Sequence, residues 1–187
     1  MGNVCRVRGE LSDASRCLKK SLKICLKLSP GSKRDLLLAS DNVNSAGLYY
    51  DRKMSVEALD FYGRSLEIYL SQYGGLHPTL THIYQRMASI HFNFKKYDKT
   101  LESAKSTVNI VQRIKGANNP APGSIYKIMA EIYWKQQNHN AALECWMKIK
   151  EMIPAPNFNT STFIDGVDFE RVLNWIDMLD HLLWRQC

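Results

Sequence analysis

The stretch Pro78–Asn119, PTLTHIYQRMASIHFNFKKYDKTLESAKSTVNIVQRIKGANN, is repeated in outline by the chain on both sides of it. Its motif Tyr84-x-x-Met87-Ala88 returns 42 residues later as Tyr126-x-x-Met129-Ala130, and 42 residues earlier as the weaker Asn42-x-x-Ser45-Ala46. A fixed period of roughly 20–50 residues is typical of an array of structural repeats. The spacing therefore predicts an array rather than one closed globular core.

Each copy divides into two segments with helical spacing of apolar residues, joined by a short polar turn. Glycine followed by proline separates the copies, as in Gly74-Gly75 before Pro78 and in Gly116 before Pro120. Glycine suits the left-handed end of a helix and proline suits the start of the next one. We therefore expect three helix pairs within residues 35–152, with helices at 36–50 and 55–72, 79–94 and 97–115, and 123–136 and 140–152.

The chain before residue 35 matches the second half of a copy only. Residues 10–28 predict one amphipathic helix whose apolar stripe is Leu11, Ala14, Leu18, Leu22, Cys25 and Leu28. Residues 1–34 contain nine Lys and Arg against two acidic residues, so they hold the whole net charge of +7. We expect residues 1–34 to be a partial, basic repeat with a basic face formed by Arg16, Lys19, Lys20, Lys23 and Lys27.

The chain after residue 152 departs from the pattern. Residues 153–165, with two prolines, asparagine and threonine, predict a linker that cannot continue a helix. Residues 166–187 return to helical spacing but lack the second helix of a repeat. We expect them to form a capping helix over the open face of the last repeat, because each repeat of an array buries its core only against neighbours.

The paired motifs resemble the tetratricopeptide repeat, with Tyr-x-x-Met-Ala followed by a small residue and an aromatic four residues on. The resemblance covers residues 10–152, and the 42-residue period is similar to the longer repeat of kinesin light chains. It implies an all-α solenoid of helix pairs whose first helices line a concave groove. In that family, groove asparagines bind cargo peptides, and this sequence has Gln85-Arg86 and Lys127-Ile128 at those positions.

One aromatic residue per copy, at Tyr50, Phe92 and Trp134, follows the 42-residue period. Each is next to a core-facing residue and so points about 100° away from it around the helix. These aromatics either floor a groove that binds an extended peptide or a helix, or wedge between repeats as core. On the first interpretation, the partner-binding residues of the concave face are Tyr50, Asp51, Gln85, Phe92, Asn93, Lys127, Glu131, Trp134 and Lys135.

The sequence contains no constellation for catalysis. The five histidines have no metal-binding spacing, and no phosphate-binding or nucleophile motif occurs. We therefore expect no catalytic residues, no metal and no cofactor. The apolar runs are too short for a membrane span, which argues against a membrane partner. No aromatic interleaves the basic face, which argues against single-stranded nucleic acid.

These features predict a non-catalytic scaffold or adaptor subunit that binds a protein segment on the concave face. The five cysteines form no C-x-x-C pair and residues 1–10 lack the apolar core of a secretory signal, so we expect a cytoplasmic protein, with a cytoskeletal assembly as one setting. The alternative is a basic module that binds an acidic polymer, such as tubulin tails or nucleic acid, through the first helix.

Overall fold

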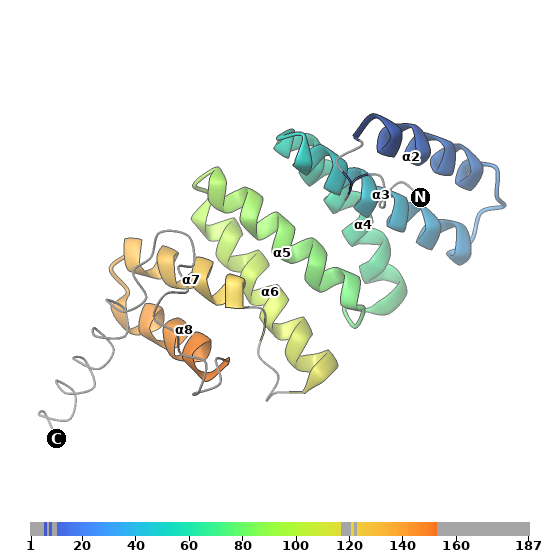
Figure 1. Ribbon diagram of the computed structural model, residues 1–187. Coiled ribbons are helices and arrows are strands. Elements are labelled where there is room, and N and C mark those ends of the chain that lie inside the picture. Colours follow the sequence, from blue (N-terminus) through green and yellow to red (C-terminus); the bar gives the residue numbers. More distant parts are fainter. Residues whose placement is uncertain (1–5, 7, 9–10, 117–120, 122, 153–187) are drawn as a thin grey trace, which may run out of the picture.

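The structure is a computed structural model that describes residues 6, 8, 11–116, 121 and 123–152. These residues form helices joined by short turns and contain no strand. The expected linker at 153–165 and capping helix at 166–187 lie outside the described residues. The helices, labelled as in Figure 1, are α2 (Leu11–Leu26), α3 (Ser32–Asp51), α4 (Ser55–Tyr73), α5 (Pro78–Asn93), α6 (Tyr97–Lys115), α7 (Gly123–Lys135) and α8 (His139–Met152).

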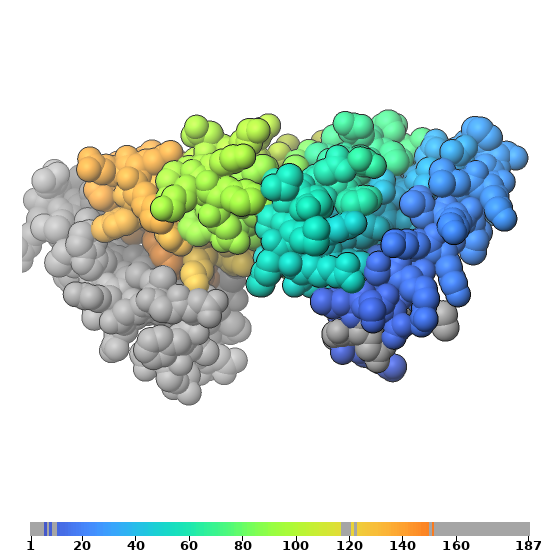
Figure 2. Space-filling model, turned by 90° about the horizontal axis from the view of Figure 1, so that it is seen from above, coloured from blue at the N-terminus to red at the C-terminus, as the bar shows by residue number. Residues whose placement is uncertain are grey.

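The helices pack as successive antiparallel pairs. The most extensive contacts join α3 with α4, α5 with α6, and α7 with α8, while α4 meets α5 and α6 meets α7 to join the pairs. Figure 2 shows the pairs following one another along an elongated surface. The chain is therefore an all-α solenoid, as the 42-residue period predicts.

The turn inside each pair has the same backbone in all three copies. Lys53, Lys95 and Gln137 have φ of 63°, 56° and 58°, in the left-handed region. In each copy the backbone N–H of the residue after this position donates to a carbonyl of the first helix. In the first copy, Met54 N donates to the Tyr49 carbonyl at 2.9 Å. This double hydrogen-bond pattern is a Schellman motif, built here without glycine. The period is therefore present in the backbone as well as in the side chains.

The connection between α4 and α5 follows the predicted glycine and proline pattern. Gly74 ends α4 with φ of 54°, and Pro78 occupies the first turn of α5. The backbone N–H of Thr79 donates to Nδ1 of His77 at 3.2 Å, so His77 caps the helix. The ring of His77 also contacts Tyr69 and Tyr73, with centroids 4.7 and 4.5 Å away. These contacts fix the angle at which the second pair follows the first.

Small residues occupy the same buried position in each of the three first helices. Ala46, Ala88 and Ala130, at equivalent positions of the first helices, are fully buried. Around them the larger core residues form two clusters, one centred on α3, α4 and α5 and the other on α6, α7 and α8. A methyl group at these positions leaves room for the neighbouring helix, and a longer side chain does not.

We expect Ala130→Leu to lower the free energy of unfolding by about 1–3 kcal/mol, because three added carbons overpack a contact without free volume. Ala130 lies among Ile125, Met129 and Cys145 in the second core cluster. The measurement is urea unfolding followed by circular dichroism. A matched control is Glu144→Leu, at an exposed position of the paired helix α8. An unchanged urea midpoint for Ala130→Leu would contradict the close packing.

Only part of the apolar stripe predicted for residues 10–28 is buried in the structure. Ala14, Leu18 and Cys25 are buried, whereas Leu22 and Leu28 are exposed. The predicted helix over 10–28 is present as α2, but Leu28 lies beyond its end and Leu22 is on its exposed side. Among the described helices only α3 packs extensively on α2, so the edge of the stripe has no covering neighbour.

Candidate functional site

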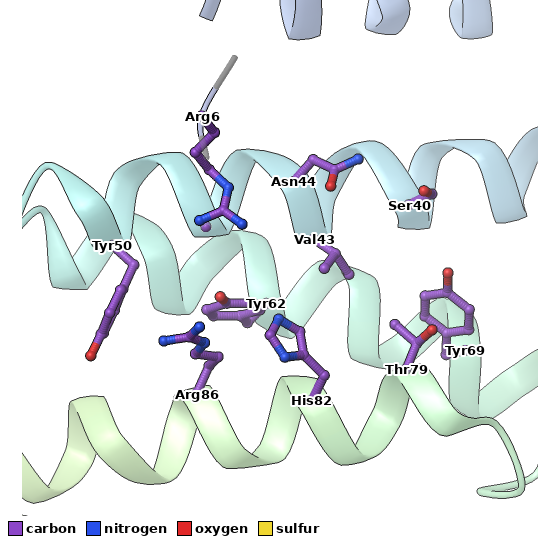
Figure 3. Close-up of a pocket in the computed structure, with 11 residues that line it drawn as sticks. Arg6, Ser40, Val43, Asn44, Tyr50, Tyr62, Tyr69, Thr79, His82 and Arg86 are labelled. Carbon is purple, nitrogen blue, oxygen red and sulfur yellow. The ribbon is translucent and has the colours of Figure 1, made fainter. Parts of the chain in front are cut away.

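A pocket opens between α3 and α5, the first helices of two consecutive repeats. We call the surface formed by α3, α5 and α7 the first-helix face. Figure 3 shows the pocket residues converging from both helices, with Tyr62 and Tyr69 of α4 forming the back. The pocket has a volume of about 290 Å³, and it is lined by Arg6, Ser40, Val43, Asn44, Gly47, Tyr50, Tyr62, Tyr69, Thr79, His82 and Arg86.

Arg6 comes from the segment before α2 and reaches across α3 into the pocket (Figure 3). Its Nη1 forms an ion pair with Oδ2 of Asp51 at 2.7 Å. A Cβ added at Gly47 would lie 3.3 Å from the guanidinium carbon of Arg6. The absence of a side chain at Gly47 therefore makes room for the arginine on the surface of α3.

Arg86 of α5 forms the opposite side of the pocket. Its guanidinium carbon lies 5.2 Å from the ring centroid of Tyr50, a cation–π contact that bridges α5 and α3. Arg86 is half-buried, and within residues 11–116, 121 and 123–152 it forms no ion pair. The stacking on Tyr50 thus orients a positive charge that no carboxylate of the described residues neutralises.

The two arginines affect the titratable groups beside them. The pKa of His82 is lowered by partial burial and by repulsion from Arg86 and Arg6. Burial raises the pKa of Tyr62 to about 12, against the opposing pull of the same two arginines. At neutral pH the pocket therefore holds two guanidinium charges, a largely neutral imidazole and the neutral hydroxyl of Tyr62.

A second cluster lies where α7 meets the turn between α5 and α6. The Nζ atom of Lys135 is 5.5 Å from the ring centroid of Phe92 and 5.6 Å from that of Tyr97. The same atom is 3.2 Å from Oε1 of Glu131, and that hydrogen bond is the main cause of a raised pKa for Lys135. Three predicted site residues are therefore brought together here, because Phe92 and Glu131 both contact Lys135.

The remaining predicted residues are dispersed over the same face. The side-chain amide of Gln85 donates to Oγ of Ser124 at 2.9 Å, which ties α5 to α7. Asn93 is exposed at the end of α5, and Lys127 is half-buried in α7. The structure thus places Tyr50 in the pocket with Asp51 beside it, groups Phe92, Glu131 and Lys135 in a separate cluster, and leaves the other predicted residues apart from both.

The three periodic aromatics differ in how far they are enclosed. Tyr50 and Phe92 are half-buried, and each packs against a core cluster. Trp134 is 46% exposed and makes an edge-to-face contact with His139, with ring centroids 4.7 Å apart. Each aromatic therefore has both a packed side and a solvent-accessible side, so neither the groove nor the core interpretation alone describes its position.

Several pocket residues were not among those predicted from the sequence. The missed polar and charged residues are Arg6, Ser40, Asn44, Thr79, His82 and Arg86. Asn44 and Arg86 are 42 residues apart and share a helix position, so the repeat alignment contained a signal for both. No sequence pattern connected Arg6 to the pocket, because it belongs to the partial repeat and arrives through tertiary packing.

The described residues offer little for metal or thiol chemistry. Among them no group of three or more His, Cys, Asp or Glu could hold a metal ion. Cys145 is buried in the core, and burial raises the pKa of its thiol to about 11, so the thiol stays protonated at neutral pH. No described helix has the length and apolar character needed to cross a membrane.

A buried histidine stands where the other copies have tyrosine. His91 is only 8% exposed, and its Nδ1 has no hydrogen-bond partner among the described residues. Burial lowers its pKa, with further repulsion from Lys99 and Lys96 and partial compensation from Glu102. Its neutral form is thus the form that packs in the core.

We expect acidification to destabilise the array through His91. The unfolded chain titrates near the ordinary pKa of about 6.5 and binds more protons than the folded chain just below it. The stability due to neutral His91 is therefore present above that pH and lost as the pH falls. His91→Tyr, which copies Tyr49 and Tyr133, should reduce the loss of urea midpoint between pH 8 and 5. Equal pH dependence in both proteins would contradict this role.

The basic face of α2 is exposed as its spacing predicts. Lys19, Lys20, Lys23 and Lys27 are exposed and form no ion pair with any described residue. Arg16 is also exposed and pairs with Asp13, one turn away on the same helix. The apolar Ile24 and Leu26, both exposed, adjoin these lysines. This surface is separate from the pocket.

Comparison with known proteins supports the architecture. A crystal structure of BtubC (BKLC) from P. vanneervenii superimposes with a TM-score of 0.68, covering 87% of this chain at 16% identity. The chain spans 62% of the length of that structure. No family model matches the sequence, and no curated protein matches it. At this identity the likeness shows the fold alone, a tetratricopeptide-like helical repeat.

Proposed function

We propose that this chain is a non-catalytic protein-binding scaffold or adaptor that holds a partner segment on the first-helix face. The observation that carries the proposal is the pocket between α3 and α5, with the accessible ring of Tyr50 at its wall. Tetratricopeptide-like arrays place their first helices on the concave side, where an extended segment can contact several repeats. The likeness to BtubC supports this geometry through the fold.

The periodic aromatics supply the apolar contacts of the proposed surface. Tyr50, Phe92 and Trp134 occur once per repeat and keep part of each ring accessible. Aromatic side chains are the commonest binding hot spots in protein interfaces. The amides and charges between them, such as Gln85, Asn93 and Lys127, would then bond the partner's backbone and polar groups.

The experiment is selection of binding peptides from a random display library on the immobilised chain. Selected peptides are then tested by fluorescence anisotropy against Tyr50→Ala and against Val56→Ala. Val56 is an exposed apolar residue of α4 that does not line the pocket. We expect Tyr50→Ala to weaken binding and Val56→Ala to leave it unchanged. Peptides that bind both variants equally would contradict the proposed surface.

A second candidate function is a basic docking module that binds an acidic polymer, such as tubulin tails, through α2. The observation that favours it is the exposed group of four lysines without described ion-pair partners. Surface charge of one sign attracts an oppositely charged partner and speeds association. With this second candidate we also propose that the protein is located in the cytoplasm or on the cytoskeleton.

For this second candidate we expect charge reversal of Lys19, Lys20 and Lys23 to Glu to weaken binding to poly-glutamate at least tenfold. All three side chains are exposed, so the melting temperature should change little. Added salt should weaken the wild-type complex as well, because exposed charges are screened beyond about 10 Å at 0.1 M salt. Binding that survives both the substitutions and the salt would remove this candidate.

A further inference from the structure

We infer that the pocket between α3 and α5 binds a phosphate monoester, presented by a phosphorylated serine or threonine of the partner segment. The inference rests on the proposed function, since it names the chemistry that the first-helix face recognises. Figure 3 shows the guanidinium groups of Arg6 and Arg86 and the imidazole of His82 directed toward the same space in front of Tyr62.

The charge of the pocket favours an anion. Arg6 and Arg86 enter from opposite sides, and Asp51, which pairs with Arg6 at 2.7 Å, is the carboxylate that adjoins them. Arg86 contacts the face of Tyr50 rather than a carboxylate. Partial burial lowers the pKa of the adjacent His82, and repulsion from Arg86 and Arg6 lowers it further, so both charges act on the region around this imidazole. An anion placed there would relieve that repulsion.

The geometry of the donors favours phosphate over carboxylate. A guanidinium presents N–H groups in a planar fork that matches phosphate or carboxylate oxygens. Stacking on Tyr50 and the ion pair with Asp51 hold the two forks in place before a ligand arrives. A phosphate monoester carries about −1.5 to −2 charges at pH 7 and three acceptor oxygens, against one charge and two oxygens for a carboxylate. Two forks on opposite sides therefore suit the phosphate better.

Uncharged donors line the same pocket, with Asn44 nearer the two arginines and Ser40 and Thr79 beside Tyr69 (Figure 3). Ser40 and Asn44 of α3 and Thr79 of α5 line the pocket together with the two arginines. Hydroxyl and amide groups can donate to phosphate oxygens that the guanidinium groups leave unbonded. The volume of about 290 Å³ is several times the roughly 30 Å³ share of one water molecule, so a phosphate ester has room to enter.

The test uses N-acetyl-O-phosphoserine methylamide as the probe and N-acetylglutamic acid methylamide as the comparison, followed by NMR of the 15N-labelled chain. We expect saturable shifts at the amides of Gly47, Thr79 and His82. Binding of the phosphoserine probe should be at least tenfold tighter than binding of the glutamate probe. Equal affinities, or shifts confined to the lysines of α2, would overturn the assignment.

Substitutions locate the site. Arg86→Gln should weaken phosphoserine binding at least tenfold. Arg64→Gln is the matched control, because Arg64 also contacts an aromatic ring, that of Phe61 at 5.5 Å, but lies on α4 outside the pocket. Equal losses in the two variants would indicate general electrostatic attraction and overturn the inference. If Arg86→Gln lowers the melting temperature, Arg6→Gln provides the same test from the other side.

The test of the phosphate site and the test of the peptide-binding function can fail independently of each other. Displayed peptides without acidic or phosphorylated residues that still require Tyr50 would leave the scaffold function standing, and failure of the phosphoserine probe would then overturn the anion site alone. Conversely, probe binding that depends on Arg86, without any selected peptide, would support the anion site and contradict peptide binding.

Discussion

Replacing Tyr62 by alanine is expected to lower the free energy of unfolding by about 3–5 kcal/mol. Tyr62 is fully buried in α4 and belongs to the core cluster that joins α3, α4 and α5. Its ring fills the space between the first two helix pairs, so alanine would leave a cavity there. Because the pairs of an array stabilise one another only through neighbours, the loss should spread along the chain.

Chemical denaturation of Tyr62→Ala and of Tyr62→Phe distinguishes the contribution of the Tyr62 ring to stability from that of its hydroxyl. Tyr62→Phe keeps the packing and removes only the hydroxyl at the back of the pocket, so we expect a far smaller change in stability. Leu70→Ala, at an exposed position of the same helix, controls for the loss of apolar volume alone. If Tyr62→Ala unfolds at the wild-type denaturant concentration, the described core of the first two pairs is wrong.

Replacing Trp134 by alanine is expected to have its largest effect on binding rather than on stability. The side chain is 46% exposed on the first-helix face and touches His139 at its edge. As an interface anchor it should contribute about 2 kcal/mol, which corresponds to about a 30-fold increase in the Kd for a selected peptide. Stability should fall by less than the roughly 3–5 kcal/mol typical of a deleted core aromatic.

Two measurements on Trp134→Ala distinguish the possible roles of the aromatics. The melting temperature reports on packing, and the anisotropy titration reports on the peptide complex. A large drop in melting temperature, with affinity lost only in proportion to unfolding, would assign Trp134 to the core. Trp134→Phe should retain part of the affinity in the groove interpretation, because an aromatic surface remains.

Much of the architecture follows from the sequence because its determinants are local and periodic. The spacing of Ala46, Ala88 and Ala130 places them at equivalent helix positions, and all three residues are fully buried. The expected helix at 97–115 has the same bounds in the structure as α6. Gly74 marks the left-handed end of α4 as predicted. Helical periodicity and helix-end residues act over one or two turns, so they can be predicted from the sequence alone.

The sequence predicted a polar turn inside each pair but not the left-handed backbone of that turn. Lys53, Lys95 and Gln137 hold left-handed backbones that are usually assigned to glycine or asparagine. Tertiary packing of the two helices imposes this conformation, because the second helix must return along the first. The residue types alone therefore carry no signal, and only their common 42-residue spacing connects them.

The sequence by itself determined the repeat period, the helix pairs, the basic face of α2 and the absence of familiar catalytic motifs. Only the tertiary structure decided where the pocket lies and which charges meet in it. Arg6 and Arg86 are 80 positions apart, and they act on one space because α3 and α5 face each other across the pocket and Gly47 leaves room for Arg6 on the surface of α3. The proximity of these two arginines depends on how the helices pack and on the absence of a side chain at Gly47. The repeat period of the sequence predicts neither of these features.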